Sequence, residues 1–185
     1  MKKYVLIAGV NGAGKSTLYQ TLDSLKNMER VNSDEIVRGF GDWKNPEDVF
    51  RAGKMAVKKV AEYFRSGVSF NQETTLCGKA ILRNIDKARA LGYEIELHYI
   101  GIESAELAKQ RIAYRVQRGG HDISNEDVDR RYLESFEHLK LVTDKCDTII
   151  LYDNTDVFKR FAVYQHGNLQ LLTDVVPGWF EKYVM

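Results

Sequence analysis

Residues 4 to 17 read Tyr-Val-Leu-Ile-Ala-Gly-Val-Asn-Gly-Ala-Gly-Lys-Ser-Thr, and this stretch decides the fold. An apolar run precedes the pattern Gly-x-x-x-x-Gly-Lys-Ser, which is the P-loop arrangement that binds nucleotide phosphates. Gly9, Gly12 and Gly14 allow backbone angles that a Cβ atom would forbid, so successive N–H groups can surround an anion. The glycine turn of dinucleotide-binding folds needs a third glycine where Thr17 stands, which counts against that alternative.

The residues of this loop have separate expected tasks. Lys15 should reach the β- and γ-phosphates, and the hydroxyl of Ser16 should hold Mg²⁺. The helix that begins near Lys15 adds the positive end of its dipole to the same place. The expected nucleotide-binding residues here are Gly9, Asn11, Gly12, Ala13, Gly14, Lys15, Ser16 and Thr17.

Length and composition narrow the class of protein. The 185 residues are within the range of one domain, which we expect to span residues 1–185. A net charge of +1 gives no general argument for binding nucleic acid or a membrane surface. Cys77 and Cys146 match no metal or redox spacing, and no segment approaches the roughly 20 apolar residues of a membrane span. These features predict a cytoplasmic protein with reduced thiols.

Strands and helices alternate along the chain, which predicts an α/β fold with helices on both faces of a parallel sheet. Five strands are expected, at residues 4–8, 30–32, 68–71, 94–100 and 147–152. Helices are expected at residues 16–25, 46–65, 78–91, 104–118, 125–144 and 177–183. Two further runs, 161–166 and 169–172, read as a small C-terminal hairpin joined by Gly167 and Asn168.

Acidic residues follow two of the expected strands. Ligands of open parallel sheets bind beyond the carboxyl ends of the strands, where Asp34 and Glu73 should lie. One carboxylate can accept a proton from an attacking hydroxyl, and the other can hold a metal ion or its waters. We therefore expect Asp34 to be a base and Glu73 to contact metal or acceptor. The alternatives are that Ser33 or Asp34 caps a short helix and that Glu73 is an ordinary turn carboxylate.

A group of arginines surrounds the glycine pair at residues 119–120. Arg111, Arg115 and Arg118 share one helix face because they are spaced i, i+4 and i+7. Arg130 and Arg131 follow on the next helix. A mobile loop flanked by arginines suits a lid, at about residues 115–131, that excludes water and neutralises charge during phosphoryl transfer. The alternative is a solvated face on which these arginines pair with nearby acids.

These segments together resemble the zeta-toxin family of P-loop kinases, typified by UDP-N-acetylglucosamine kinase, and especially its compact members. The resemblance is carried by residues 9–17, 31–35, 70–75, 115–121, 130–132 and 152–155. It implies an adenylate-kinase-like core that transfers the γ-phosphate of ATP to a hydroxyl group of a sugar nucleotide, with Mg²⁺ as the cofactor.

The resemblance also implies roles for individual residues. It implies that Lys15 binds the phosphates and that Asp34 is the base. It also implies that Glu73 and Thr75 contact the acceptor, with Glu73 reaching the metal through water. The implied lid arginines are Arg118 together with Arg115 or Arg131, and Asn154 is implied on the adenine side. The sequence departs from the family where Thr74 replaces a usual glycine and where Cys77 replaces a basic or hydroxyl residue.

The leading hypothesis is a P-loop kinase that phosphorylates a small acceptor, with UDP-N-acetylglucosamine as the best single guess. One alternative is a regulatory ATPase or switch, which would need no acceptor pocket. Another is a kinase for a different small hydroxyl compound or a nucleic-acid end, and the near-neutral charge counts against nucleic acid. The expected partners are ATP and the acceptor, without a membrane, and no pattern in the sequence indicates an antitoxin.

Overall fold

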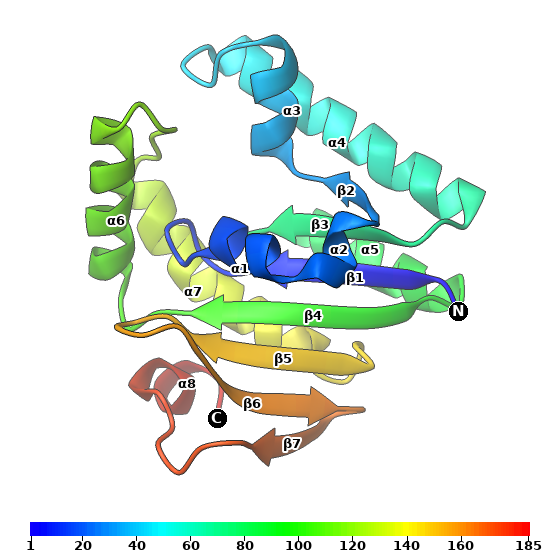
Figure 1. Cartoon of the computed structure of the whole chain (residues 1–185), viewed down its shortest axis with the longest axis vertical. Coiled ribbons are helices and arrows are strands. Elements are labelled where there is room, and N and C mark those ends of the chain that lie inside the picture. Colours follow the sequence, from blue (N-terminus) through cyan, green and yellow to red (C-terminus); the bar gives the residue numbers. More distant parts are fainter.

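A seven-stranded sheet in the order β2-β3-β1-β4-β5-β6-β7 organises the chain in this computed structural model, which describes residues 1–185 (Figure 1). The strands are β1 Lys3–Ala8, β2 Glu29–Val31, β3 Phe70–Thr74, β4 Glu94–Gly101, β5 Thr148–Asp153, β6 Lys159–Gln165 and β7 Asn168–Leu171. The first five strands pair in parallel, and β6 and β7 add to the β5 edge in antiparallel fashion. The expected α/β class is confirmed, and the hairpin proves to be a continuation of the sheet.

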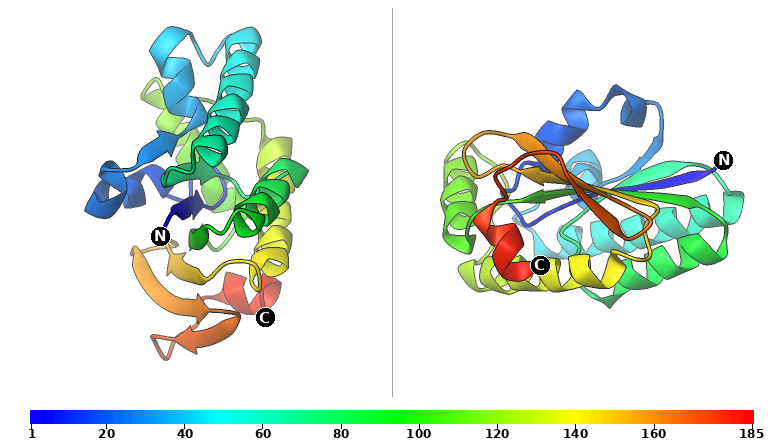
Figure 2. Two further views of the ribbon diagram at one scale, coloured as in Figure 1. Left: turned by 90° about the vertical axis from the view of Figure 1, so that its right-hand side faces the viewer. Right: turned by 90° about the horizontal axis from the view of Figure 1, so that it is seen from below.

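Helices cover both faces of this sheet. They are α1 Lys15–Thr21, α2 Asp23–Lys26, α3 Ser33–Phe40, α4 Pro46–Ser66, α5 Lys79–Ala90, α6 Ala105–Gln117, α7 Asn125–Val142 and α8 Gly178–Tyr183. Figure 2 shows α5, α7 and α8 on one face and α1 with α2 on the other. None of these helices is both long enough and apolar enough to cross a bilayer.

The central strand is apolar along its length because both of its faces are covered. Residues 4–8 of β1 are each at most 1% exposed. Tyr4 packs against Phe64 of α4 and Phe70 of β3, with ring centroids 5.4 and 4.7 Å apart. This packing fixes β1, so the loop that leaves its carboxyl end starts from a rigid base.

Three local expectations need correction. The expected helix 16–25 is interrupted at Leu22, whose φ of −99° and ψ of 85° are not helical. Strand β3 extends to Thr74, so Glu73 lies inside it opposite Ile7 of β1, because pairing with β1 prolongs the strand beyond its apolar start. A full helix, α3, follows β2, and its N-cap is Asn32, whose Oδ1 accepts from the Asp34 amide at 2.9 Å.

The C-terminal hairpin also differs by one position from the expected turn. His166 and Gly167 occupy its two central positions with φ values of 47° and 80°, and Asn168 already pairs with Gln165. Two positive φ angles are what a two-residue hairpin turn requires. After β7 the chain returns to the sheet through α8, whose Trp179 is 1% exposed and packs on Phe161.

Candidate active site

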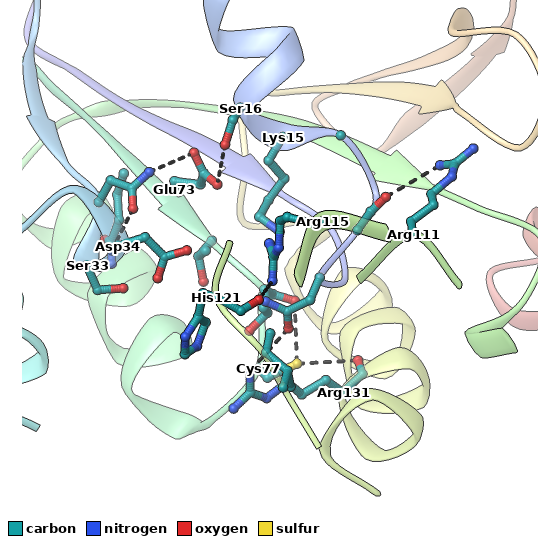
Figure 3. A pocket seen from close by; sticks show the side chains of 18 of the residues that line it. Lys15, Ser16, Ser33, Asp34, Glu73, Cys77, Arg111, Arg115, His121 and Arg131 are labelled. Atoms are coloured by element: carbon teal, nitrogen blue, oxygen red, sulfur yellow. Dashed lines mark hydrogen bonds between the residues drawn. The ribbon is translucent and has the colours of Figure 1, made fainter. Parts of the chain in front are cut away.

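A cavity of about 740 Å³ lies at the carboxyl ends of β1 and β3 (Figure 3). Only Val49, Cys77 and Ile123 of its 22 lining residues are hydrophobic, so it suits a charged ligand. Eleven of the residues expected from the sequence line it: Asn11, Gly12, Gly14, Lys15, Ser16, Thr17, Asp34, Glu73, Thr75, Arg115 and Arg131. Gly9, Ala13, Arg118 and Asn154 do not.

The loop between β1 and α1 has the backbone of an anion cradle. Gly9, Gly12 and Gly14 all have positive φ, at 140°, 81° and 104°. A Cβ atom on Gly9 would lie 2.4 Å from the carbonyl oxygen of Ile100, so the loop can pass β4 only without a side chain there. The loop geometry therefore depends on glycine for both conformation and space.

Lys15 stands at the centre of the cavity and bends back over its own loop (Figure 3). Its Nζ donates to the carbonyl oxygens of Gly9 at 2.8 Å and Val10 at 3.1 Å. Burial lowers the pKa of this ammonium group, and the negative charges of Glu73 and Asp34 oppose that shift. The side chain is thus a desolvated cation beside the loop amides, where a phosphate would stabilise its charged form.

Glu73 is held in one orientation by its neighbours. Its Oε2 accepts from Arg30 Nη2 at 2.8 Å and from Asn32 Nδ2 at 3.0 Å. Its Oε1 lies 3.4 Å from the Ser16 hydroxyl (Figure 3). One oxygen is therefore occupied by donors, and the other faces the start of α1.

The arrangement of Ser16 and Glu73 fits a magnesium ion bound through phosphates. No group of three or more His, Cys, Asp or Glu side chains is arranged to hold a metal by itself. Mg²⁺ commonly keeps several waters and uses one or two carboxylates together with substrate phosphates. Ser16 would hold such an ion directly, and Glu73 Oε1 would hold one of its waters.

Asp34 reaches the cavity from the first turn of α3. The side chain is exposed, and no hydrogen bond engages its carboxylate oxygens. Figure 3 shows it beside Glu73, on the opposite side of Lys15 from Arg111. Because Asn32 caps α3, the carboxylate of Asp34 is not used to cap the helix and remains free to face a ligand.

Two of the three proposed lid arginines line the cavity. Arg131 Nη1 donates to Asn11 Oδ1 of the P-loop at 3.1 Å, and its Nη2 lies 3.3 Å from Asp127. Arg115 donates from Nη2 to the carbonyl oxygen of His121, while its buried Nε has no partner. A buried donor without a partner costs free energy, so the Nε–H group of Arg115 is available to donate to a bound anion.

Arg118 lies outside this group, in contrast to its expected role. It forms the C-cap of α6 and is exposed, with its guanidinium 4.4 Å from the Tyr114 ring centroid. The helix ends at Gln117, and stacking on the preceding turn directs this side chain away from the cavity. Arg111 instead lines the cavity, donating to the carbonyl oxygens of Thr155 at 2.9 Å and Gly12 at 3.4 Å.

Asn154 supports the P-loop from behind. Its Nδ2 donates to the carbonyl oxygen of Ala13 at 2.8 Å, and a Cβ atom on Gly14 would lie 2.6 Å from the same nitrogen. The neighbouring Asp153 is buried and accepts from Trp179 Nε1 at 3.0 Å. The expected adenine contact of Asn154 stays a prediction, and its visible contact is with the loop backbone.

Sequence reasoning missed two residues of the site, Arg30 and Asn32, and it named Arg111 only as a member of the arginine group, without a role of its own. Arg30 joins Glu73 to Asn71 and Glu35, at 2.8 to 3.0 Å, and its guanidinium lies 3.5 Å from the centroid of Tyr19. The sequence did contain an indication of the role of Arg30. It lies in a short expected strand, and an arginine that is buried in a strand needs an acidic partner nearby.

Together these features define a P-loop domain of the kinase-like type. The chain matches the family model described as AAA domain over residues 5–139, and it belongs to that family. An uncharacterized protein of Haemophilus influenzae is 33% identical over 133 residues, which are 70% of this chain and 92% of that protein.

Solved structures agree with this fold. The AvrRxo1-ORF1:AvrRxo1-ORF2 complex with ATP contains a chain that superposes with a TM-score of 0.74 at 13% identity. That match covers 99% of this chain and 63% of the other, so this chain spans less than two thirds of that protein. A chain of the PezAT toxin–antitoxin system of Streptococcus pneumoniae has a TM-score of 0.61 at 18% identity, covering 85% of this chain and 70% of that one. At these identities the likeness concerns the fold alone.

Proposed function

We propose that this protein is an ATP-dependent kinase that transfers the γ-phosphate to a hydroxyl group of a small acceptor. The observation that carries the proposal is the free carboxylate of Asp34, which faces the same cavity as the P-loop. A protein that only binds and hydrolyses nucleotide does not need a free carboxylate beside its phosphate site. The cavity supplies a base at Asp34, a fixed carboxylate at Glu73 and room for an acceptor.

The nucleotide would bind first through the P-loop. The loop amides and the N-terminus of α1 would surround the β- and γ-phosphates. Lys15 would leave the carbonyl oxygens of Gly9 and Val10 and move to the phosphates, where its charge is better stabilised. Ser16, and Glu73 through a water molecule, would hold Mg²⁺, and the bound ion would neutralise part of the phosphate charge.

The transfer itself would use Asp34 and the arginines. The acceptor hydroxyl gives its proton to the Asp34 carboxylate while its oxygen forms a bond to the γ-phosphorus, and the bond from that phosphorus to the ADP oxygen breaks. Arg115 and Arg131 would stabilise the charge on the transferring group, since both line the cavity. Thr75 also lines it and would contact the acceptor.

UDP-N-acetylglucosamine remains our best single guess for the acceptor, on the resemblance to zeta-toxin kinases. The likeness to a chain of the PezAT system concerns the fold alone and does not bear on the acceptor. We propose one catalytic domain over residues 1–185. Reduced Cys77 and Cys146 suit the cytoplasm, where we propose that it acts.

Transfer of radiolabelled phosphate from ATP to a panel of hydroxyl metabolites, including UDP-sugars, tests this function. We expect one labelled product in the wild-type protein, and none in the Lys15→Ala and Asp34→Asn variants. ATP binding and hydrolysis without any labelled acceptor would instead favour the switch or regulatory ATPase.

A further inference from the structure

A second cavity lies beside the first one, and the mechanism proposed above does not use it. Its volume is about 320 Å³, which is near the lower end of the roughly 300–1,000 Å³ of small-molecule sites. It opens between the loop at residues 41–45, which joins α3 to α4, and the loop at residues 118–124, which joins α6 to α7. His121 lines both cavities, so the two are neighbours.

Trp43 contributes the largest side chain among the residues that line this second cavity. The ring is half-buried, with the Arg38 guanidinium 5.3 Å from its centroid. The imidazole of His121 meets it edge-on, with centroids 6.5 Å apart and an interplanar angle of 62°. An indole in a cavity wall is a stacking surface for a planar group such as a nucleobase.

The glycine pair also lines this cavity. Gly119 has a φ of 81°, and a Cβ atom on Gly120 would lie 2.5 Å from Cγ of Arg115. Arg115 lines the phosphate cavity and donates to the carbonyl oxygen of His121, so it holds in place the residue that lines both cavities. Gly119 and Gly120 therefore contribute backbone alone to the lining and leave room beside Trp43.

The polar groups of this cavity are few. Lys44 offers an ammonium group, and Asp122 offers a carboxylate whose Oδ1 already accepts from the Ile123 amide at 2.7 Å. A sugar would leave several buried hydroxyl groups unpaired among the side chains of Lys44, His121 and Asp122, and each unpaired group weakens binding. A planar ring with one donor edge and one acceptor edge fits this combination better.

We propose that the second cavity is a subsite for a planar heterocyclic ring of the acceptor. The ring stacks on Trp43, and the rest of the acceptor extends past His121 toward Asp34. The identification of this ligand as an acceptor rests on the proposed kinase function. Binding of the ring itself requires no phosphate transfer.

Tryptophan fluorescence gives a direct test because the chain has only two tryptophans, and Trp179 is 1% exposed in the core. The nucleotide site is first saturated with Mg²⁺ and a non-hydrolysable ATP analogue. The probes are then UDP and GDP, which carry a small and a large ring, and ribose 5-phosphate, which carries none. We expect saturable quenching by at least one nucleotide and none by ribose 5-phosphate, with the quenching absent in Trp43→Phe.

Calorimetry with the same probes separates stacking from other contacts. Trp43→Ala should weaken binding of the quenching nucleotide by about 5- to 150-fold, and Trp43→Phe should restore most of the affinity. Phe50→Ala is the matched control, because Phe50 is an exposed aromatic residue of α4 that lines neither cavity. The Phe50→Ala variant should bind the quenching nucleotide with the affinity of the wild type.

Each other outcome has a definite meaning. No quenching by either nucleotide, equal quenching by ribose 5-phosphate, or full affinity in Trp43→Ala would overturn the subsite. Quenching with no phosphate transfer to any acceptor would keep the subsite and reject the kinase. Transfer to an acceptor without a ring, unaffected by Trp43→Ala, would keep the kinase and reject the subsite.

Discussion

Arg30 donates from Nη2 to Glu73 Oε2 over 2.8 Å, and the two side chains are only 10% and 11% exposed. This buried ion pair joins β2 to β3 directly below the phosphate site. Removal of one member of such a pair costs about 3–5 kcal/mol because the other charge stays buried and unpaired. The pair is therefore a structural element of the site as well as part of its electrostatics.

Arg30→Met should lower the free energy of unfolding by about 3 kcal/mol or more, measured by urea denaturation. The double variant Arg30→Met with Glu73→Gln should recover part of that loss, because no buried charge then lacks its partner. Arg83→Met is the control, as an exposed arginine of α5 without an ion pair. A loss below about 1 kcal/mol in the single variant would mean that the pair is solvated.

Asp34→Asn should reduce phosphate transfer by about 10²- to 10⁴-fold, the usual range for loss of a general base. The affinity for MgATP should stay within about twofold, because Asp34 stands outside the phosphate cradle. Steady-state transfer kinetics and equilibrium titration measure the two quantities separately. Transfer at nearly the wild-type rate would show that the carboxylate accepts no proton.

Arg115→Ala should lower kcat by about 10³-fold or more, in the range of catalytic arginines, if it contacts the transferring group. Arg118→Ala should leave kcat within about twofold, because Arg118 stacks on Tyr114 outside the cavity. Each variant thus serves as the control for the other, because the two arginines are close in sequence but only Arg115 lines the cavity. A larger loss in Arg118→Ala would require the loop at residues 118–124 to rearrange when substrate binds.

MgATP binding should take up protons at alkaline pH through Lys15. Burial lowers the pKa of free Lys15 below its usual 10.5, so part of the population is neutral below that pH. A bound phosphate favours the ammonium form and raises the pKa, so binding draws a proton from solution. Calorimetry at pH 9 in buffers of different ionisation enthalpy measures this uptake, which should disappear in Lys15→Ala.

Glu96→Gln should reduce stability near neutral pH but not in acid. His98 Nε2 lies 2.6 Å from Glu96 Oε1, and this hydrogen bond lowers the pKa of the Glu96 carboxyl below its usual 4.5. A lowered folded-state pKa stabilises the protein above 4.5, and this contribution is lost as the pH falls through the folded value. Thermal melts of both proteins from pH 7 to 3 should therefore converge toward the acid end.

The sequence was most informative where local pattern decides the structure. The apolar run at residues 4–8 and the glycines after it predicted both β1 and the P-loop, since strand, turn and helix follow one another without help from distant residues. The position of Glu73 was less predictable. Strand β3 continues through it because Ile7 of β1 pairs with Glu73, after the pairing with β2 has ended at Gln72.

Contacts between distant segments explain the other differences. The spacing correctly placed Arg111 and Arg115 on one helix face, but helical spacing does not say that the helix ends before Arg118 or that the Arg118 guanidinium stacks on Tyr114. The role of Arg30 needed three partners from α3 and β3, which only the fold brings together.

The hydrogen bond from Trp179 to Asp153 has a consequence for how the protein is divided in experiments. The family match stops at residue 139, before β5 and the helix that carries Trp179. Asp153 also accepts from the Thr155 hydroxyl at 2.7 Å, and the Thr155 carbonyl in turn holds Arg111 against the P-loop. A fragment trimmed to the matched region would lack the residues that support its own phosphate cradle, so weak nucleotide binding by that fragment would reflect the truncation and not the full chain.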